Sequence, residues 1–333
     1  MPIDYETLEN IPRLLMEADL KPLQGDRFQP TGFPDLGPAR YTAPDGNEKL
    51  LVESPQSVAN RMEWACWDQG KQEIIEELKG LPYIKVVSSD GKHVTNSLLE
   101  AHRINSEYIM GGKASEQFKS LFEEEIEYRK DGRVNWRKFW DALFKYDPNS
   151  LLHGCFLEEI GGRLRVTRAI SGFIEATGVR EAESGGVKNN IVQPELKGGE
   201  GNVPYHRTEF TAERITAFFN LDLALLRSYG LAEHAKKLLI ALALFKIRRF
   251  LSTGLRLRTA CDLGVVGDLK VTRPENGFAI PDEHHLLTEC QKLIEECRKT
   301  GLFAKPPVTE VKWQEEKKKR KEGEREGTEE TEE

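Results

Sequence analysis

The stretch at residues 238–263, LLIALALFKIRRFLSTGLRLRTACDL, contains the change of period that decides the fold. Its first part, residues 238–245, is an unbroken apolar run rich in leucine and alanine, which is typical of a helix buried on most sides. The helix is expected to end at Arg248 and Arg249, before the breaker Gly254.

Beyond this breaker the period changes to two. Leu255 and Leu257 alternate with two arginines, which predicts a two-faced strand. Arg256 and Arg258 would lie about 7 Å apart, close to the phosphate spacing of an extended nucleic-acid strand, because alternate strand residues are separated by twice the rise of about 3.3 Å. A solvated sheet face explains one arginine pair equally well, so a nucleic-acid surface requires arginines at comparable places elsewhere.

The 333-residue chain has a formal net charge of −7. This excess of acid argues against a protein that coats nucleic acid through bulk electrostatics, so a nucleic-acid site would have to be a local groove. Apolar residues make up 38% of the chain, enough to bury a large core. No apolar run approaches the roughly 18 residues of a membrane span, and the N-terminus lacks the features of a signal peptide, so cytoplasmic residence is expected.

The five cysteines and seven histidines show no spacing typical of a metal site. Cys290 and Cys297 would lie about 10 Å apart on one helix, too far for a disulfide. His284 and His285 are adjacent, and adjacent residues diverge by about 100° on a helix. We therefore expect neither a metal nor a cofactor.

The N-terminal part predicts a strand at residues 11–24, where apolar and polar side chains alternate. The loop that follows, residues 24–46, is dense in glycine and proline and carries Arg27 beside Phe28. Such a pair can hold phosphates and stack bases, but Phe28 can equally anchor the loop to the core.

A second strand is predicted at residues 49–53, followed at once by a helix. Ser54 is placed to cap this helix and Pro55 to start it. Arg61 lies at the edge of its apolar stripe, where it can reach a ligand or simply snorkel to solvent.

Residues 72–146 predict a mostly helical insertion that lies apart from the sheet, with no recognisable chemistry. From Leu151 the pattern is strand-like again, and Arg163, Arg165 and Arg168 follow a Gly-Gly turn. Arg163 and Arg165 fall on one face of an extended segment, which repeats the disposition of the first arginine pair. Two strands with the same basic face favour a nucleic-acid surface.

Residues 179–210 form a long segment rich in glycine, asparagine and proline without core periodicity. Its length and composition suit a protruding hairpin that lies along a ligand, with Lys188, His206 and Arg207 as candidate contacts. No Gly-Lys-Ser/Thr follows the glycines, which disfavours a P-loop.

The remaining segments predict two helices and a tail. Residues 212–220 are expected to form a helix with Arg214 in its first turn, and residues 282–299 an amphipathic helix. The low-complexity tail beyond Trp313 is expected to be disordered.

Several of these segments resemble a known family as a set. They are, in chain order, GDRFQPTGFPDLG, LLVESPQSVANRME, ALFKYDPNSLLHG, SGGVK, GNVPYHRTEFTAERI and IALALFKIRRFLSTGLRLRTACDL. The set resembles the backbone subunit of the type I-U (also called I-G) CRISPR Cascade effector, a member of the repeat-associated RAMP superfamily, over roughly residues 10–263.

The resemblance implies an α+β fold, a modified RRM or ferredoxin-like palm with a helical insertion and a glycine-rich thumb excursion. The palm with its insertions would form a single domain at residues 1–310. The finger-like insertion would lie at about 72–146, the thumb at about 179–210, and a disordered charged tail at 311–333.

The resemblance also implies a non-catalytic subunit that binds CRISPR RNA, polymerises head to tail along it and presents it to target DNA in antiviral defence. Other partners would be the large subunit and the repeat-processing subunit that binds the 5′ handle, without a membrane or cofactor. Guide phosphates would be held without sequence preference, because base pairing supplies the specificity. The candidate RNA-binding residues are Arg27, Arg61, Arg163, Arg165, Arg168, Lys188, His206, Arg207, Arg214, Arg248, Arg256 and Arg258.

Two other functions stay open. Relatives in type III complexes cut bound RNA with an aspartate near the first strand and a divalent ion, and Asp26 is the candidate here. A lone aspartate beside Gly25 is more often a turn residue, and a hard cation prefers several oxygen ligands. The third possibility is a protein-interaction scaffold whose arginines form salt bridges within the fold.

Overall fold

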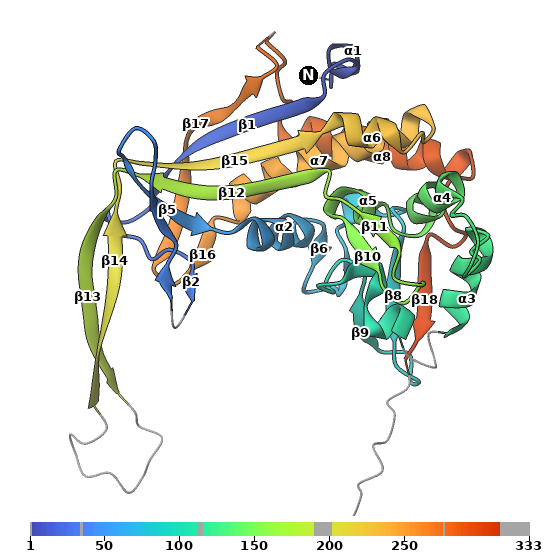
Figure 1. Ribbon diagram of the computed structural model, residues 1–333, viewed down its shortest axis with the longest axis horizontal. Helices are drawn as coiled ribbons and strands as arrows, with labels where there is room; N and C mark the ends of the chain where they lie inside the picture. The colour runs from blue at the N-terminus through green and yellow to red at the C-terminus, as the bar shows by residue number, and fades with distance from the viewer. Residues whose placement is uncertain (1, 34–35, 112–115, 190–201, 276, 314–333) are drawn as a thin grey trace, which may run out of the picture.

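A computed structural model describes residues 2–33, 36–111, 116–189, 202–275 and 277–313. No helix within these ranges is long and apolar enough to cross a membrane. The ranges contain both helices and strands, arranged around one large sheet (Figure 1).

The large sheet is curled and antiparallel, with seven strands in the spatial order β16-β17-β1-β15-β12-β5-β4. The first strand alternates as expected: Leu14, Met16, Ala18 and Leu20 are buried on one face. The seven strands are β1 (Arg13–Pro22), β4 (Arg40–Thr42), β5 (Glu48–Glu53), β12 (Ile170–Thr177), β15 (Arg214–Asp222), β16 (Arg256–Arg258) and β17 (Cys261–Arg273).

Helices cover one face of this sheet. Along the chain, α2 (Pro55–Trp64) precedes β12 and α7 (Glu233–Thr253) precedes β17, while α8 (Glu283–Lys299) packs on α7 (Figure 1). Ser54 caps α2 by accepting from the Ser57 N–H, as predicted. The predicted amphipathic helix α8 is also confirmed.

The opposite face of the central strands is not basic. Asp19, Glu175 and Asp222 each form an ion pair there with one cation, from Lys270, Lys49 and Arg13 respectively. Phe173 and Phe218 stack between them with ring centroids 5.0 Å apart. On these strands the outward carboxylates balance the cations.

The predicted buried helix is confirmed, but it is longer than expected. α7 continues through Arg248 and Arg249 to Thr253. Gly254 then caps it, and its N–H donates to the Phe250 carbonyl at 2.8 Å. A Cβ at this position would approach the Phe250 ring to 2.7 Å, so the close approach requires glycine.

The insertion at 72–146 is only partly helical, which corrects the expectation. Its β8 strand pairs antiparallel with β9 and parallel with β18, which comes from the C-terminal part of the chain. Tyr83–Val87 is rich in β-branched residues, a strand signal that the helical interpretation overlooked. The insertion contains β7 (Glu73–Ile74), η1 (Glu76–Leu78), β8 (Tyr83–Val87), β9 (His93–Asn96), η2 (Arg103–Asn105), η3 (Glu107–Gly111), α3 (Glu116–Glu125) and α4 (Trp136–Tyr146).

Two further expectations about the insertion and the tail are wrong. The insertion does not lie apart, because one continuous hydrophobic core includes Phe122 and Phe139 together with Leu242 of α7. The tail does not begin at 311: β18 (Val308–Lys312) is a strand, and the Trp313 N–H donates to the Val87 carbonyl at 2.8 Å. Residues 314–333, where the disordered tail was expected, lie outside the described residues.

Two segments have a different secondary structure from the prediction. The expected helix at 212–220 is strand β15, in which Ile215, Ala217 and Phe219 point into the core. This strand pairs with β1 on one side and β12 on the other, so long-range pairing decides its state. The strand expected from Leu151 starts later, because Pro148–His153 forms helix α5.

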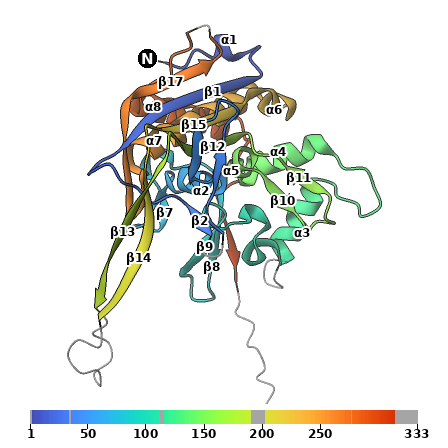
Figure 2. The same cartoon turned by 60° about the vertical axis from the view of Figure 1, so that its left-hand side comes forward.

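The expected protruding hairpin is confirmed. β13 (Arg180–Asn189) and β14 (Asn202–Thr211) pair antiparallel along their lengths and project from the end of the sheet (Figures 1 and 2). Residues 190–201 between them lie outside the described part. The other short elements are α1 (Tyr5–Leu8), β2 (Gly32–Phe33), β3 (Gly37–Pro38), β6 (Trp67–Asp68), β10 (Cys155–Leu157), β11 (Leu164–Val166) and α6 (Leu223–Ser228).

Candidate nucleic-acid interface

The loop after β1 is fastened to the base of the hairpin by its aromatic residue. Phe28 and Phe210 of β14 exchange backbone hydrogen bonds of 2.8 and 2.9 Å, and both side chains are buried. Phe28 is thus an anchor rather than a stacking surface. Its neighbour Arg27 is consequently held beside Glu209 of β14.

Glu209 is shared by two of the candidate arginines. Its carboxylate is buried and accepts Arg207 Nη2 at 2.5 Å, while Arg27 Nη1 lies 3.6 Å away. Arg27 itself stays exposed. Two guanidinium groups around one carboxylate leave this cluster with one positive charge.

A second glutamate joins β5, α2 and β16 in the same way. Glu53 is 2% exposed, forms an ion pair with Arg258, and lies 3.8 Å from Arg61 Nε. Arg61 Nη2 also donates to the Leu257 carbonyl at 2.6 Å. The cluster is again one carboxylate with two arginines.

Arg256 and Arg258 therefore differ, although the sequence places them as an equivalent pair. Arg258 donates to the carbonyls of Gln29 at 2.7 Å and Val52 at 3.2 Å as well as to Glu53, which makes it an anchor between strands. Arg256 is exposed and has no carboxylate partner among the described residues. Its guanidinium is free to bind an anion.

A groove of about 430 Å³ lies where these elements meet. It runs between the end of β1, the loop after it, β14 and the β16–β17 turn. Its charged lining residues are Asp26, Arg27, Glu209, Arg256 and Asp262.

Asp26 lies in this groove, but the surroundings do not form a metal site. Nowhere in the described part of the chain are three or more His, Cys, Asp or Glu side chains arranged to hold a metal ion. Glu209, which lines the same groove, is instead held by two arginines. Asp26 therefore has no described neighbours placed to hold a metal ion with it.

Arg168 is a further candidate arginine, and it lies beside α2, the helix that carries Arg61. It lies between β11 and β12 and donates to the side-chain carbonyl of Gln56 in the first turn of that helix. Burial and the nearby guanidinium of Arg103 lower the pKa of Arg168 from its ordinary value. Arg61 and Arg168 thus border the same helix, one toward each end.

Arg163 and Arg165 do not share a sheet with Arg256. They lie on the small β10–β11 sheet, where Arg165 is 4.4 Å from the centroid of the Phe156 ring. Arg163 precedes the strand, stacks over Tyr128 and donates to the Lys130 carbonyl at 2.9 Å. The two arginine pairs therefore do not form one continuous basic face, because their strands belong to separate sheets.

The other candidates are dispersed. Arg248 forms an ion pair with Asp268 and donates to the Ile280 carbonyl at 2.8 Å, away from the groove lining. Arg214 is exposed at the first residue of β15, and His206 is exposed on β14. Lys188 belongs to β13, but its side chain lies outside the described part.

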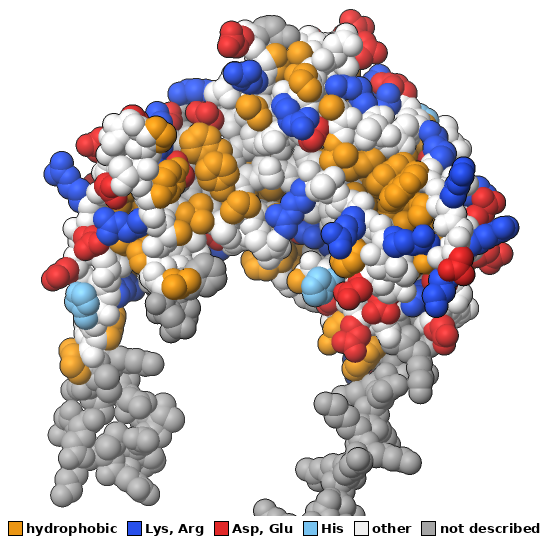
Figure 3. Space-filling model, viewed as in Figure 1, with side chains coloured by type: hydrophobic (Ala, Val, Ile, Leu, Met, Phe, Trp, Pro, Cys, Tyr) orange, Lys and Arg blue, Asp and Glu red, His pale blue; other side chains and the backbone are white. Residues whose placement is uncertain are grey.

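Helix α2 has an exposed face that was not predicted from the sequence. Gln56 and Trp64 are exposed there, and Asn60 lies between them on the same side of the helix. A helical projection would have found this face, because the buried stripe is Val58 with Met62. Figure 3 shows the surface hollowed between the hairpin and the insertion, with Lys and Arg side chains along its upper edge near α2 and β11.

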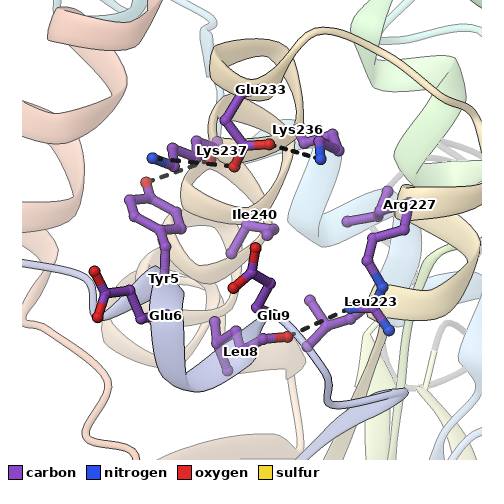
Figure 4. A pocket seen from close by; sticks show the side chains of 11 residues that line it. Tyr5, Glu6, Leu8, Glu9, Leu223, Arg227, Glu233, Lys236, Lys237 and Ile240 are labelled. Atoms are coloured by element: carbon purple, nitrogen blue, oxygen red, sulfur yellow. Dashed lines mark hydrogen bonds and ion pairs between the residues drawn. The ribbon is translucent and has the colours of Figure 1, made fainter.

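A cavity of about 130 Å³ lies far from these residues, between α1, α6 and α7 (Figure 4). Its cations are already engaged: Lys236 pairs with Glu233 at 2.6 Å, and Arg227 donates to the carbonyls of Leu8 and Ile11. Tyr5 donates toward Glu289. None of the candidate residues lines this cavity, and its charges are internally balanced.

Comparison with known proteins identifies the family. Residues 14–181 match the family described as CRISPR-associated protein GSU0053, which covers just over half of the chain. The chain belongs to this CRISPR-associated, Cas7-like family. No curated protein matches the sequence.

Three solved structures are similar at low identity. One, "CRISPR RNA-guided surveillance complex, pre-nicking", has 14% identity and a TM-score of 0.41, covering 87% of this chain and 89% of the other. A second, "CRISPR RNA-guided surveillance complex", has 14% identity and a TM-score of 0.35, covering 86% and 83%. Csc2 of Thermofilum pendens has 11% identity and a TM-score of 0.30, covering 90% and 81%.

Proposed function

We propose that this protein is a non-catalytic backbone subunit of a type I Cascade complex that binds CRISPR RNA in the groove at the base of the hairpin. The observation that carries the proposal is the convergence of Arg27, Arg61, Arg207 and Arg256 from four separate segments. Family membership supplies the context of antiviral defence.

The charge balance of the groove supports an anionic ligand. Glu53 and Glu209 each face two guanidinium groups, so each cluster keeps one positive charge, and Arg256 adds another. Asp26 and Asp262 on the groove wall offset two of these three charges, which leaves one positive charge. RNA phosphates would accept hydrogen bonds from these guanidinium groups and balance the remaining positive charge. Contacts to phosphate alone give binding without sequence preference, as a guide of variable sequence requires.

The connectivity supports a modified ferredoxin-like or RRM-like palm. The order β1, α2, β12, β15, α7, β17 along the chain and β17-β1-β15-β12 in space is the β-α-β-β-α-β arrangement of such folds. In this proposal the hairpin β13–β14 is the thumb and the insertion is the finger. The guide lies in the hollow between them (Figure 3).

The proposal includes assembly. Copies of this chain stack head to tail along the guide, and the length of the guide limits a filament that would otherwise stay open. The stacked copies display the guide for pairing with target DNA. The large subunit and the subunit that processes the repeat and binds the 5′ handle complete the complex. Binding along a shared RNA multiplies a modest affinity per subunit.

The test is RNA binding and assembly by variants with reversed charge. We expect Arg27→Glu with Arg256→Glu to abolish co-purifying RNA and long oligomers, measured by absorbance ratio and mass photometry. Lys270→Glu, on the charge-balanced outer face of the large sheet, is the matched control and should retain both. Unchanged RNA content in the double variant would refute the proposal and favour a scaffold without nucleic acid.

The nuclease alternative has a separate test. The assembled wild-type complex and Asp26→Ala would each be incubated with labelled complementary RNA and magnesium. We expect no cleavage by either protein. Evenly spaced cuts that disappear in Asp26→Ala would show that the subunit is catalytic.

A further inference from the structure

The exposed face of α2 is free of acid in a chain with 55 acidic residues. The only carboxylate in this helix, Glu63, is buried and paired with Arg103. Guanidinium groups border the face: Arg61 lies on α2 itself, and Arg168 donates to Gln56. The local charge therefore complements an anion along the helix.

Trp64 is the large apolar side chain of this face, with 53% of its surface exposed. The other four tryptophans each pack against a neighbouring ring, whereas Trp64 has no ring partner within the described residues. An exposed indole one helical turn from Arg61 is typical of an interaction site rather than of a core.

The helix geometry aligns this indole with the polar groups. Gln56, Asn60 and Trp64 are spaced by four residues, so they form one row about 12 Å long. Gln56 donates to the Asn60 side chain at 3.0 Å, which orders the row. Arg61 of the same helix donates to the Leu257 carbonyl of β16, the strand that also carries the groove residue Arg256, so α2 lies next to that strand.

We propose that Trp64 stacks on a base of the bound RNA while the bordering arginines hold its phosphates. The inference rests on the proposed function and adds a base contact to it. Stacking on an indole accepts any base, since every base has a π-face, so the contact is compatible with guides of any sequence. An exposed aromatic ring one turn from a guanidinium group fits a single-stranded nucleic acid, whose bases stack on the ring and whose phosphates pair with the cation. An acidic peptide would pair with the cation only.

The experiment compares two ligands by fluorescence anisotropy. One is a labelled single-stranded oligoribonucleotide, and the other has the same length and backbone but abasic positions throughout. Trp64→Ala is expected to weaken binding of the normal RNA by about 5- to 150-fold, the effect of losing one stacked base, and to leave binding of the abasic strand unchanged. Trp64→Phe should recover most of the loss.

Trp136→Ala removes a tryptophan of similar exposure, 45%, from α4 and is the matched control, expected to bind like wild type. Equal weakening on both ligands, or no weakening by Trp64→Ala, would overturn the stacking contact. Loss of oligomers in Trp64→Ala with intact RNA binding would assign Trp64 to a protein contact and also overturn it. If wild type binds the normal RNA and Arg256→Glu abolishes this, the proposed function stands even when the stacking inference fails.

Discussion

Glu63 and Arg103 form a bidentate ion pair with both side chains almost fully buried. Arg103 Nε and Nη2 lie 2.7 Å from the two carboxylate oxygens, and Asn149 donates to the same carboxylate. The pair joins α2, which packs on the large sheet, to the insertion, which contains Arg103. Because α2 also carries Arg61 and Trp64, this pair fixes the helix that faces the proposed RNA.

Arg103→Met is expected to lower the free energy of unfolding by about 3–5 kcal/mol, because it leaves a buried carboxylate without its counter-charge. Urea unfolding followed by circular dichroism measures the change. Arg298→Ala, which removes an exposed pair with Glu295, should leave the unfolding midpoint in place. Adding Glu63→Gln to Arg103→Met should recover part of the loss, and a further additive loss would contradict the ion-pair explanation.

Asp147 gives the fold a pH dependence. It is completely buried, and burial raises the pKa of its carboxyl to about 7, well above the ordinary 3.8. The folded state therefore keeps a proton that the unfolded state has released, so the free energy of unfolding falls as pH rises from about 4 to about 7. Each pKa unit of difference corresponds to about 1.4 kcal/mol.

Asp147→Asn should remove this contribution, because the amide resembles the protonated carboxyl and can still accept from Ser150. The measurement is urea unfolding of both proteins across that pH range. The two stability curves should diverge as pH rises, with the variant the more stable at the alkaline end. Asp141→Asn, on the exposed side of α4, should follow the wild-type curve, and parallel curves for Asp147→Asn would contradict the prediction.

Glu209→Gln should tighten RNA binding. The substitution removes the negative charge that Arg27 and Arg207 share and frees them for phosphate. In a salt titration of RNA affinity, the slope of log K against log salt should steepen by about 0.7 for each phosphate newly neutralised. Glu175→Gln, on the face of β12 away from the groove, is the control with no expected change, and weaker binding by Glu209→Gln would place the RNA elsewhere.

Gly172→Ala should destabilise the large sheet by about 1–3 kcal/mol through overpacking. A Cβ on Gly172 of β12 would lie 2.7 Å from the Phe219 ring and 2.9 Å from the Phe218 carbonyl. Thermal unfolding by scanning calorimetry measures the effect. Ser171→Ala at the neighbouring, half-buried position should unfold close to wild type; equal losses for both variants would contradict the steric explanation.

Local patterns in the sequence determined much of the framework. The alternation of β1, the Ser54 cap of α2, the apolar run of α7 and the amphipathic stripe of α8 are visible in consecutive residues, because each element buries a face with its own period. The hairpin could also be predicted from consecutive residues, because a long glycine-rich segment without apolar periodicity has few side chains to bury in a core. The candidate residues Arg27, Arg61, Arg207 and Arg256 also came from such patterns.

Only the tertiary structure decided how these parts meet. The sequence of β15 predicts a helix, but the segment is a strand because β1 and β12 pair with its two edges. Strand β18 pairs with β8, which lies more than 200 residues earlier in the chain. Likewise, Arg258 pairs with Glu53, whereas Arg256 has no carboxylate partner in the part of the chain that the structure describes, although only one residue separates the two arginines. Strand pairing and charge pairing depend on partners that are distant in sequence, so the side-chain period that defines each element contains no information about them.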